Sequence, residues 1–208
     1  MRGPIERFFP NLSHGQKVAL DWVLTIVGAV AIVIGVKAWI VNPYRIPTSS
    51  MEPTLHCARP GDACEASSSD RILANRFIYH FRDPRRGEIV VFNAPAAAAR
   101  ECVSGIFVKR IIGLPGEQWS ERRGVTYING RHLSEPYIHP GRRDHDTKTL
   151  LDIPPTGKLE RIPAGMYLVE GDNRTRSCDS RVWGLVPRKN IIGKVFLTYW
   201  PLNRIGIP

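Results

Sequence analysis

The longest apolar stretch of the chain lies near its N-terminus. Residues 22–41 are almost all apolar, and about 20 such residues are enough to cross the hydrocarbon core of a bilayer as a helix. A buried core helix is the alternative, but the run is apolar on all sides, which is not the pattern of a surface helix. The bulky residues that follow do not form the small-x-small site of a cleavable signal peptide. We therefore expect an uncleaved, single-pass anchor. Residues 1–21 would be a cytoplasmic tail, because Arg2, Arg7 and Lys17 outnumber the acidic residues there.

Beyond residue 41 the apolar positions form short runs separated by glycine and proline. Val, Ile, Phe and Tyr are frequent in these runs, which is typical of β-strands. The pair Asn129-Gly130 is a strong hairpin signal. Strands are expected at residues 44–46, 71–75, 88–92, 105–112, 125–128, 166–169 and 191–200. We predict a mainly β fold, an antiparallel β-sheet or barrel-like domain preceded by one N-terminal transmembrane helix.

Residues 131–163 differ from the rest of this domain. They are polar, basic and rich in proline, with little periodicity. We interpret them as an inserted cap on the sheet rather than as core, so that the β domain consists of residues 42–130 and 164–208. Residues 94–100 are expected to form a surface loop or a short helix. For Phe196 to Pro201 there are two interpretations, contact with lipid or a buried C-terminal strand, and the strand is favoured.

Composition and charge narrow the functional classes. The 208 residues suffice for one domain, and 43% of them are hydrophobic, enough for a core. A formal charge of +10 suits nucleic acid, acidic lipid or an acidic partner. However, the cations occur as scattered pairs, without a zinc-finger spacing or an RNA-binding aromatic signature. This pattern argues against nucleic-acid binding.

The cysteines suggest one disulfide and leave a second pair undecided. Cys57 and Cys64 enclose six residues, including Pro60-Gly61, which can turn the chain back. In an external domain this spacing supports a disulfide. A metal site is disfavoured, because there is no Cys-x-x-Cys pair and the six histidines fit no ligand spacing. Cys102 and Cys178 are free, buried or paired with each other, and the sequence does not decide among these states.

Three hydroxyl residues lie between two prolines shortly after the apolar run. These are Thr48, Ser49 and Ser50, between Pro47 and Pro53. The prolines favour an extended or turning backbone that presents the hydroxyls. By composition alone the segment is a Ser/Thr/Pro linker. A serine becomes a good nucleophile only when a neighbouring base accepts its proton, so its function depends on whether the chain supplies a base.

A candidate base lies in the strand predicted at residues 105–112, where Lys109 and Arg110 interrupt apolar residues. Alternation places the two cations on opposite faces, each with apolar neighbours. Arginine does not lose its proton in proteins, whereas a buried lysine can. Lys109 is therefore the candidate base, and a structural lysine that extends its amine to solvent is the alternative. A third polar segment, residues 171–184, has the composition of a loop holding supporting hydrogen bonds or an Asp–Arg pair, or of a solvated turn.

Taken together, four segments resemble the ordered boxes of the type I signal peptidases, the Ser/Lys endopeptidases that remove signal peptides from exported preproteins. The resemblance covers most of residues 38–200, with residues 131–163 poorly matched. It implies an enzyme of the bacterial plasma membrane that acts on signal-peptide-bearing preproteins and needs no metal or other cofactor. The segments are Ser50-Met51-Glu52-Pro53-Thr54-Leu55, Arg86-Gly87-Glu88-Ile89-Val90-Val91-Phe92, Lys109-Arg110-Ile111-Ile112-Gly113-Leu114-Pro115-Gly116-Glu117, and Gly171-Asp172-Asn173 with Ser177 through Arg181.

The resemblance also implies roles for individual residues. Ser50 matches the nucleophile, with Ser49 as its nearest competitor, and Lys109 matches the general base. The oxyanion would be held by the Ser50 amide and by the hydroxyl of Thr48, where many members carry serine. The supporting residues implied are Ser177, which would orient the lysine by a hydrogen bond, the pair Asp179 and Arg181, and Arg110, an ion-pair partner of Asp172 or Asp179.

Two shallow apolar subsites beside Ser50 would accept the small residues of an Ala-x-Ala-like cleavage site. The residues implied to line them are Tyr44, Ile46, Pro47 and Val108. Ser50 follows Val41 by nine residues, so we expect it close to the outer membrane surface, in a protein that contacts lipid and acts as a monomer.

Two other functions match part of the sequence. One is a Ser/Lys autoprotease of the soluble repressor type, against which the anchor and the Gly171-Asp172-Asn173 box argue. The other is an anchored β module that binds peptides without cleaving them. The joint presence of Ser50, Lys109 and Ser177 argues against that module.

Overall fold

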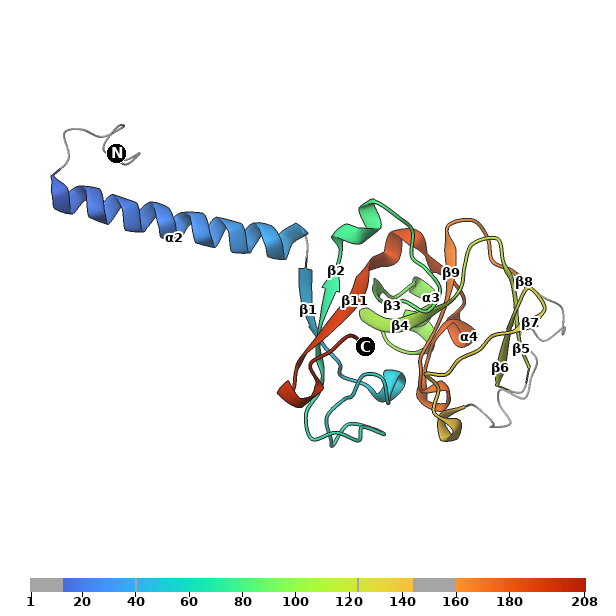
Figure 1. Cartoon of the computed structure of the whole chain (residues 1–208). Helices are drawn as coiled ribbons and strands as arrows, with labels where there is room; N and C mark the ends of the chain where they lie inside the picture. Colours follow the sequence, from blue (N-terminus) through green and yellow to red (C-terminus); the bar gives the residue numbers. More distant parts are fainter. Residues whose placement is uncertain (1–12, 40, 123, 144–159) are drawn as a thin grey trace. The chain divides into compact units, whose positions relative to one another are not determined.

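A computed structural model describes residues 13–39, 41–122, 124–143 and 160–208. The chain divides into two compact units, Met1–Val41 and Asn42–Pro208. The first contains helix α2 (His14–Trp39) and the second contains the strands (Figure 1). The division falls at the end of the apolar run.

Helix α2 begins eight residues before the predicted apolar run. Its start has a local cause, because Ser13 and Gln16 form a reciprocal capping box: the Gln16 N–H donates to Ser13 Oγ at 3.4 Å and the Ser13 N–H donates to Gln16 Oε1 at 2.9 Å. Residues 14–35 are long and apolar enough to span a membrane, and the most apolar window of this segment is not buried in the described structure. No other helix of the described residues meets this test.

The second unit is built on a seven-stranded sheet with the order β1-β2-β11-β3-β4-β9-β10. Neighbouring strands from β2 to β10 pair antiparallel. The predicted mainly β fold is therefore confirmed, and β2 and β11 match their predicted bounds. The strands of this sheet are β1 (Val41–Arg45), β2 (Arg71–Asn75), β3 (Ile89–Asn93), β4 (Ile106–Gly113), β9 (Met166–Glu170), β10 (Val186–Pro187) and β11 (Ile191–Trp200).

Residues 196–200 are part of strand β11, which lies between β2 and β3. The interpretation of this segment as a C-terminal strand is therefore correct, but of residues 196–200 only Thr198 is buried, and Trp200 is 42% exposed. Two short helices connect elements of the sheet. Helix α3 (Ala96–Glu101) overlaps the segment predicted as a loop or short helix and extends one residue beyond it, and α4 (Ser180–Trp183) was not predicted.

A second, four-stranded sheet has the order β7-β6-β5-β8 and lies on the far side of β9 in Figure 1. Its strands are β5 (Gln118–Arg122), β6 (Val125–Ile128), β7 (Arg131–His132) and β8 (Glu160–Arg161). The β6–β7 hairpin turns at Asn129 and Gly130, with φ values of 51° and 75°. Positive φ at both central residues is what a tight hairpin of this kind requires, so the predicted hairpin is confirmed.

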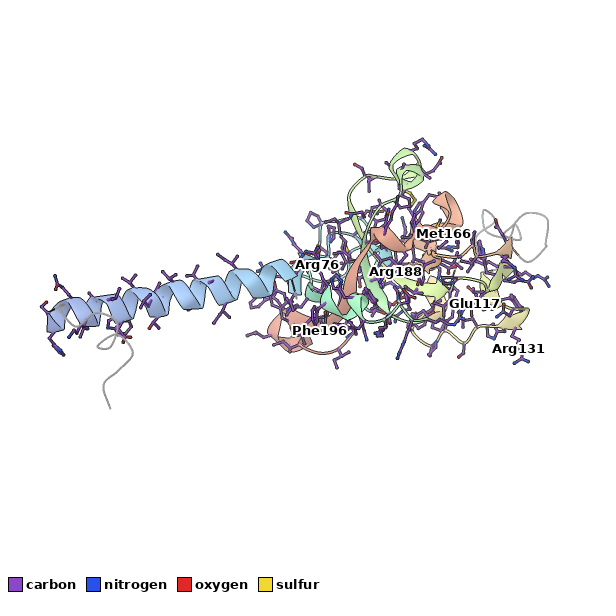
Figure 2. The ribbon with its side chains drawn as sticks, turned by 90° about the horizontal axis from the view of Figure 1, so that it is seen from above. Arg76, Glu117, Arg131, Met166, Arg188 and Phe196 are labelled. Carbon is purple, nitrogen blue, oxygen red and sulfur yellow. A yellow bond between two sulfur atoms is a disulfide. The ribbon has the colours of Figure 1, made fainter. Side chains whose placement is uncertain are left out.

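The segment 131–163 is more than a polar cap. It supplies two strands of the second sheet, and Arg131 lies at an outer end of the domain (Figure 2). However, Ile162 is fully buried, and Glu135 and Ile138 are nearly so. The expectation that this segment contributes nothing to the core was wrong, because a few buried residues are spaced too irregularly to give a periodic signal. Residues 144–159 of it lie outside the described residues.

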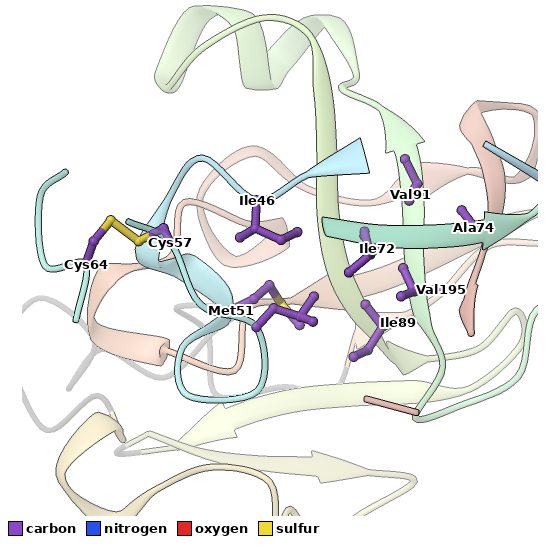
Figure 3. Packing of buried hydrophobic residues seen from close by; sticks show 10 residues of the cluster. Ile46, Met51, Cys57, Cys64, Ile72, Ala74, Ile89, Val91 and Val195 are labelled. Atoms are coloured by element: carbon purple, nitrogen blue, oxygen red, sulfur yellow. A yellow bond between two sulfur atoms is a disulfide. The ribbon is translucent and has the colours of Figure 1, made fainter. Parts of the chain in front are cut away.

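Three clusters of buried residues form the core of this unit. The first cluster contains residues of the connection between β1 and β2. There Ile46 and Met51 pack against residues of β2, β3 and β11 (Figure 3). The second covers the opposite region around Phe92, Ile111 and Trp183, and the third joins the second sheet to Leu168. Strand β4 contributes to both of the latter clusters, so its central residues are held in place on both faces.

Candidate functional site

The hydroxyl segment forms a short turn on a well-packed support. Thr48 is extended, and Ser49–Met51 make one 3-10 turn whose three residues are buried. Met51 anchors this turn in the first core cluster. The backbone thus turns immediately before Pro53, in agreement with the constraint that the prolines impose. Ser50 is held between the core below it and a hollow above it.

Lys109 of strand β4 reaches this turn. Its Nζ lies 2.6 Å from Ser50 Oγ, although the two residues are 59 positions apart. Both side chains are almost inaccessible, with 8% of Ser50 and 4% of Lys109 exposed. The alternative of a lysine that extends its amine to solvent is therefore wrong, because the amine ends on the serine oxygen.

The surroundings of Lys109 favour its neutral form. Burial lowers its pKa from 10.5 to about 8, since the ammonium loses its hydration. This value is the balance of several effects, because the carboxylate of Asp179 raises the pKa, Arg181 lowers it and Asp172 raises it. Desolvation is the largest of these effects, so an appreciable fraction of the amine is unprotonated near neutral pH.

The neighbouring cation on β4 has a different environment. Arg110 makes a bidentate ion pair with Asp172, with Nε–Oδ1 at 2.9 Å and Nη2–Oδ2 at 2.6 Å. Its guanidinium also stacks over the ring of Tyr137, 4.1 Å from the centroid. Thr54 donates to the same carboxylate at 2.6 Å. The sequence left Asp172 and Asp179 open as partners of Arg110, and in the structure the partner is Asp172. Because Asp172 also accepts the bond from Thr54, its carboxylate links β4 to the chain after Ser50.

Asp179 and Arg181 form a second bidentate pair, with both N–O distances at 2.9 Å. Asp179 also accepts the backbone N–H of Gly171 at 3.0 Å. Burial raises the pKa of Asp179, but the ion pair with Arg181, together with Lys109 and Ser177, outweighs this effect and lowers the pKa to about 2. The carboxylate is therefore ionised at neutral pH and helps to fix the fold of the loop.

The expected hydrogen bond between Ser177 and Lys109 is not present. Ser177 Oγ is buried and lies close enough to Asp179 to help lower the pKa of that carboxyl group, although it does not meet the full geometry of a hydrogen bond with any described residue. Ser177 also lies against the Cα of Gly171, where a Cβ would come within 2.3 Å of its Oγ. The amine of Lys109 is directed at Ser50, whereas Ser177 lies beside the carboxylate of Asp179.

The loop at residues 171–184 also contacts the turn directly. The Asn173 side chain donates to the carbonyl of Ser49 at 3.0 Å, and its backbone N–H donates to the carbonyl of Ser50 at 3.1 Å. These bonds fix the peptide groups on both sides of the Ser50 Cα, including the one that carries the Ser50 N–H. The sequence analysis named Asn173 only as part of a resembling box, since no local pattern indicates a contact 124 residues away.

The burial of Arg174 is the clearest evidence that residues 171–184 do not form a solvated turn. This residue is only 2% exposed, and it pairs with Glu135 and, at 2.8 Å, with Glu170. Its Nε also donates to the carbonyl of Gly171 at 3.1 Å. A buried arginine needs acidic or hydrogen-bonding partners. Here the carboxyl group of Glu170 comes from β9, and that of Glu135 comes from the segment expected to be a cap. A charged residue in a polar loop gives no sequence signal of such burial.

The Thr48 hydroxyl lies on the same side of the turn as the serine. Thr48 Oγ1 is 3.5 Å from Ser50 Oγ, and its backbone is extended, with φ −131° and ψ 157°. An exposed hydroxyl in this position can turn towards an atom that approaches Ser50.

A hollow of about 390 Å³ opens above Ser50 and Lys109. All four residues implied to bind substrate line it, together with Thr48 and with apolar side chains of β4 and the α3–β4 connection. The four are Tyr44, Ile46, Pro47 and Val108. The walls are thus formed by the chain that follows β1 and by β4, two extended segments between which a peptide can lie.

Two disulfides are present in the second unit. Cys57 is joined to Cys64, the pair for which the spacing indicated a bond. Cys102 is joined to Cys178, which was one of the three states left open. Both residues of the second pair line the hollow, so this bond connects the α3–β4 connection to the loop that carries Asp179.

Comparison with known proteins agrees with this geometry. The sequence pattern of the family described as "Signal peptidase, peptidase S26" matches residues 19–200. The chain is 38% identical over 185 residues to the probable signal peptidase I-2 of Synechocystis sp., covering 88% of this chain and 74% of that protein. It is 34% identical over 195 residues to signal peptidase IB of Staphylococcus aureus, covering 90% and 93% of the two chains. The crystal structure of a signal peptidase I from Enterococcus faecalis is 35% identical, with a TM-score of 0.43, and covers 54% of this chain and 97% of that one. The chain therefore belongs to the type I signal peptidases, a family of serine peptidases.

Proposed function

We propose that this protein is a membrane-anchored endopeptidase that cleaves exported preproteins after a small-x-small site, with Ser50 as the nucleophile and Lys109 as the general base. One observation carries the proposal: a buried lysine amine lies 2.6 Å from a serine hydroxyl at the floor of a peptide-sized hollow. A lysine with a purely structural role would not require its amine to lie next to a serine hydroxyl. The lowered pKa of Lys109 supports the same assignment, since a base must be neutral to accept a proton.

The reaction follows the acyl-enzyme scheme. Neutral Lys109 accepts the proton of Ser50 while Oγ attacks the carbonyl carbon after the small residue. The ammonium formed then donates this proton to the leaving amine, and the C–N bond breaks. In the second half, Lys109 accepts a proton from water as the water attacks the ester, and returns it to Ser50 Oγ.

The oxyanion would be held by the Ser50 N–H and the Thr48 hydroxyl. The 3.5 Å separation of Thr48 Oγ1 from Ser50 Oγ leaves room for the hydroxyl to turn towards a bound oxyanion. Asn173 supports this donor pair, because it fixes the carbonyls of Ser49 and Ser50 and thereby the peptide plane that presents the N–H. The pairs Arg110–Asp172 and Asp179–Arg181 act as positioning groups for β4 and for the loop.

The apolar hollow suits the end of a signal peptide. Tyr44, Ile46 and Val108 line its walls, which favours small apolar side chains next to the scissile bond. Helix α2 would anchor the enzyme in the bacterial plasma membrane by a single crossing. The excess of cations before it places the N-terminus in the cytoplasm and the second unit outside. The enzyme would contact lipid through this anchor and act as a monomer.

The test uses the purified full-length chain in detergent with a preprotein whose signal peptide ends in Ala-x-Ala. Ser50→Ala and Lys109→Ala should each lower the rate of cleavage by about a thousand-fold or more, since they remove the nucleophile and its base. Lys109→Arg should be equally inactive, because it keeps the charge but cannot become neutral.

Ser49→Ala is the matched control. It removes the adjacent hydroxyl and should keep activity, and equal loss in Ser49→Ala and Ser50→Ala would contradict the assignment of the nucleophile. Substantial cleavage by Lys109→Arg would contradict the assignment of the base. Cleavage of the chain itself without cleavage of the preprotein would indicate an autoprotease, and peptide capture without cleavage would indicate a binding module.

A further inference from the structure

A second hollow adjoins the first and has no role in the mechanism above. It is open to solvent, with a volume of about 460 Å³. Three segments far apart in the sequence form it: the loop closed by the Cys57–Cys64 disulfide, the residues around His139 and Arg142, and the loop that follows Gly171. None of these segments supplies Ser50 or Lys109, so the hollow is separate from the reacting groups.

Two residues connect this second hollow to the turn that carries Ser50. Arg176 lines both hollows. Asn173 lines the second hollow and is hydrogen-bonded to the carbonyls of Ser49 and Ser50. A peptide that occupies the first hollow up to Ser50 and continues in an extended conformation therefore has the second hollow next to its path.

The two hollows differ in chemistry. Apolar side chains dominate the first, whereas the second is lined by Arg142, Arg176, Glu65, His139 and polar groups. Two guanidinium groups face it against one carboxylate, so it carries a positive excess. Arg142 is already engaged with Glu65 in an ion pair. That leaves Arg176 as the cation best placed to receive a further carboxylate.

Arg176 makes an ion pair with Asp62 that another carboxylate can replace. Its Nη1 lies 3.5 Å from Asp62 Oδ2, and the two side chains are 57% and 87% exposed. An ion pair so open to water is weak, because solvent screens the charges and both side chains lose rotational freedom. Asp62 does not line the hollow. A substrate carboxylate can therefore replace it at little cost.

From this we infer that the second hollow binds the first residues of the mature protein, downstream of the cleaved bond, and that Arg176 selects an acidic side chain there. The inference rests on the proposed function, in which the signal peptide occupies the first hollow. The occupant is a polar or acidic peptide segment emerging from the scissile bond. The effect is one of substrate selection, additional to the requirement for small residues before the bond.

Peptide substrates that differ only after the cleavage site test this inference. All peptides in the set would have a signal portion that ends in Ala-x-Ala. They would differ in carrying glutamate, glutamine or lysine at the first and second positions of the mature part. With the full-length enzyme in detergent at low salt, kcat/KM should be about three- to five-fold higher for glutamate than for glutamine, the size expected of one exposed ion pair. Lysine should be the poorest of the three, and the preference should weaken at high salt because exposed charges are screened.

In Arg176→Gln the ratio of glutamate to glutamine should fall to about one, mainly through KM, and Arg176→Lys should restore part of it. The matched control is Arg100→Gln on α3, an exposed arginine that lines neither hollow and removes the same charge. If the wild-type enzyme cleaves all three peptides equally, or if Arg100→Gln abolishes the preference as well, the inference is wrong while the proposed function stands. If the wild-type enzyme cleaves none of them, or Ser50→Ala cleaves them normally, the proposed function itself fails.

Discussion

Replacing Lys109 with methionine should stabilise the second unit at neutral pH while it abolishes the proposed activity. Burial lowers the pKa of the amine from 10.5 to about 8, and each pKa unit corresponds to about 1.4 kcal/mol. Keeping the ammonium in the folded state below pH 8 therefore costs about 3 kcal/mol. Methionine has a similar length and avoids this cost. It loses the contact with Ser50, worth about 1 kcal/mol, so a net gain of about 2 kcal/mol is expected at pH 7.

The pH dependence is the distinctive part of this prediction. Because the folded pKa of Lys109 lies below the unfolded one, the folded state binds fewer protons between pH 8 and 10.5. The free energy of unfolding of the wild type should therefore rise across that interval. Lys109→Met has no such rise, so its advantage should be constant below pH 8, vanish between pH 9 and 10, and become a disadvantage of about 1 kcal/mol by about pH 10.5, where only the lost contact with Ser50 remains.

Urea unfolding of the full-length chain in detergent, followed by tryptophan fluorescence from pH 6 to 11, measures this difference. A gain of about 2 kcal/mol shifts the midpoint by roughly 1 M for a domain of this size. The control is Lys189→Met, because that lysine is exposed and its loss should change stability by no more than about 0.5 kcal/mol at any pH. A Lys109→Met variant that is less stable than the wild type at pH 7, or an advantage that does not change with pH, would refute the reasoning.

Three further predictions address the same site. In the wild type, kcat/KM for a peptide substrate should rise with pH and level off above an apparent pKa near 8, the pKa of Lys109; a rate that is already constant at pH 6 would exclude this residue as the base. Gly171→Ala should destabilise the fold by about 1–3 kcal/mol and impair cleavage, because a Cβ would lie 2.3 Å from the carbonyl oxygen of Ser50. Gly206→Ala, which meets nothing within 4 Å, should be nearly neutral in the same urea and activity assays. Burial raises the pKa of Glu170 to about 8, so the wild type should lose stability as pH rises from 4.5 to about 8; Glu170→Gln should remove this loss, and equal pH profiles in urea unfolding would contradict it.

The sequence predicts those strands whose side chains alternate or form continuous apolar runs. Strands β2 and β11 are correct to the residue: β-branched and aromatic residues dominate β11, and β2 has a short apolar run between Arg71 and Asn75. Strand β5 was not predicted, because Trp119, Ser120 and Glu121 are buried in succession and two of these three residues are polar. Their burial depends on the second sheet and on Arg181, which lies 3.7 Å from Glu121, and no local pattern contains that information.

In the candidate site, too, some residues could be predicted from the sequence and others could not. Lysine chemistry and the resemblance were sufficient to single out Lys109 and Ser50. The burial of Arg174 against Glu135 and Glu170 could not be predicted, because each of these residues alone has the composition of a solvated surface. The expected bond from Ser177 to the lysine was wrong for a geometric reason. The side chain packs over Gly171, and sequence does not reveal which of two nearby groups a hydroxyl will face.

The site is made of parts that leave the ribosome at very different times. The turn bearing the serine comes first, its lysine follows 59 residues later, and the clamp from Asn173 arrives 124 residues after Ser49. If Ser50 and Lys109 carry out the proposed cleavage, a growing polypeptide has no complete centre until the loop after Gly171 has been made. The proposed activity would then appear only together with the completed fold.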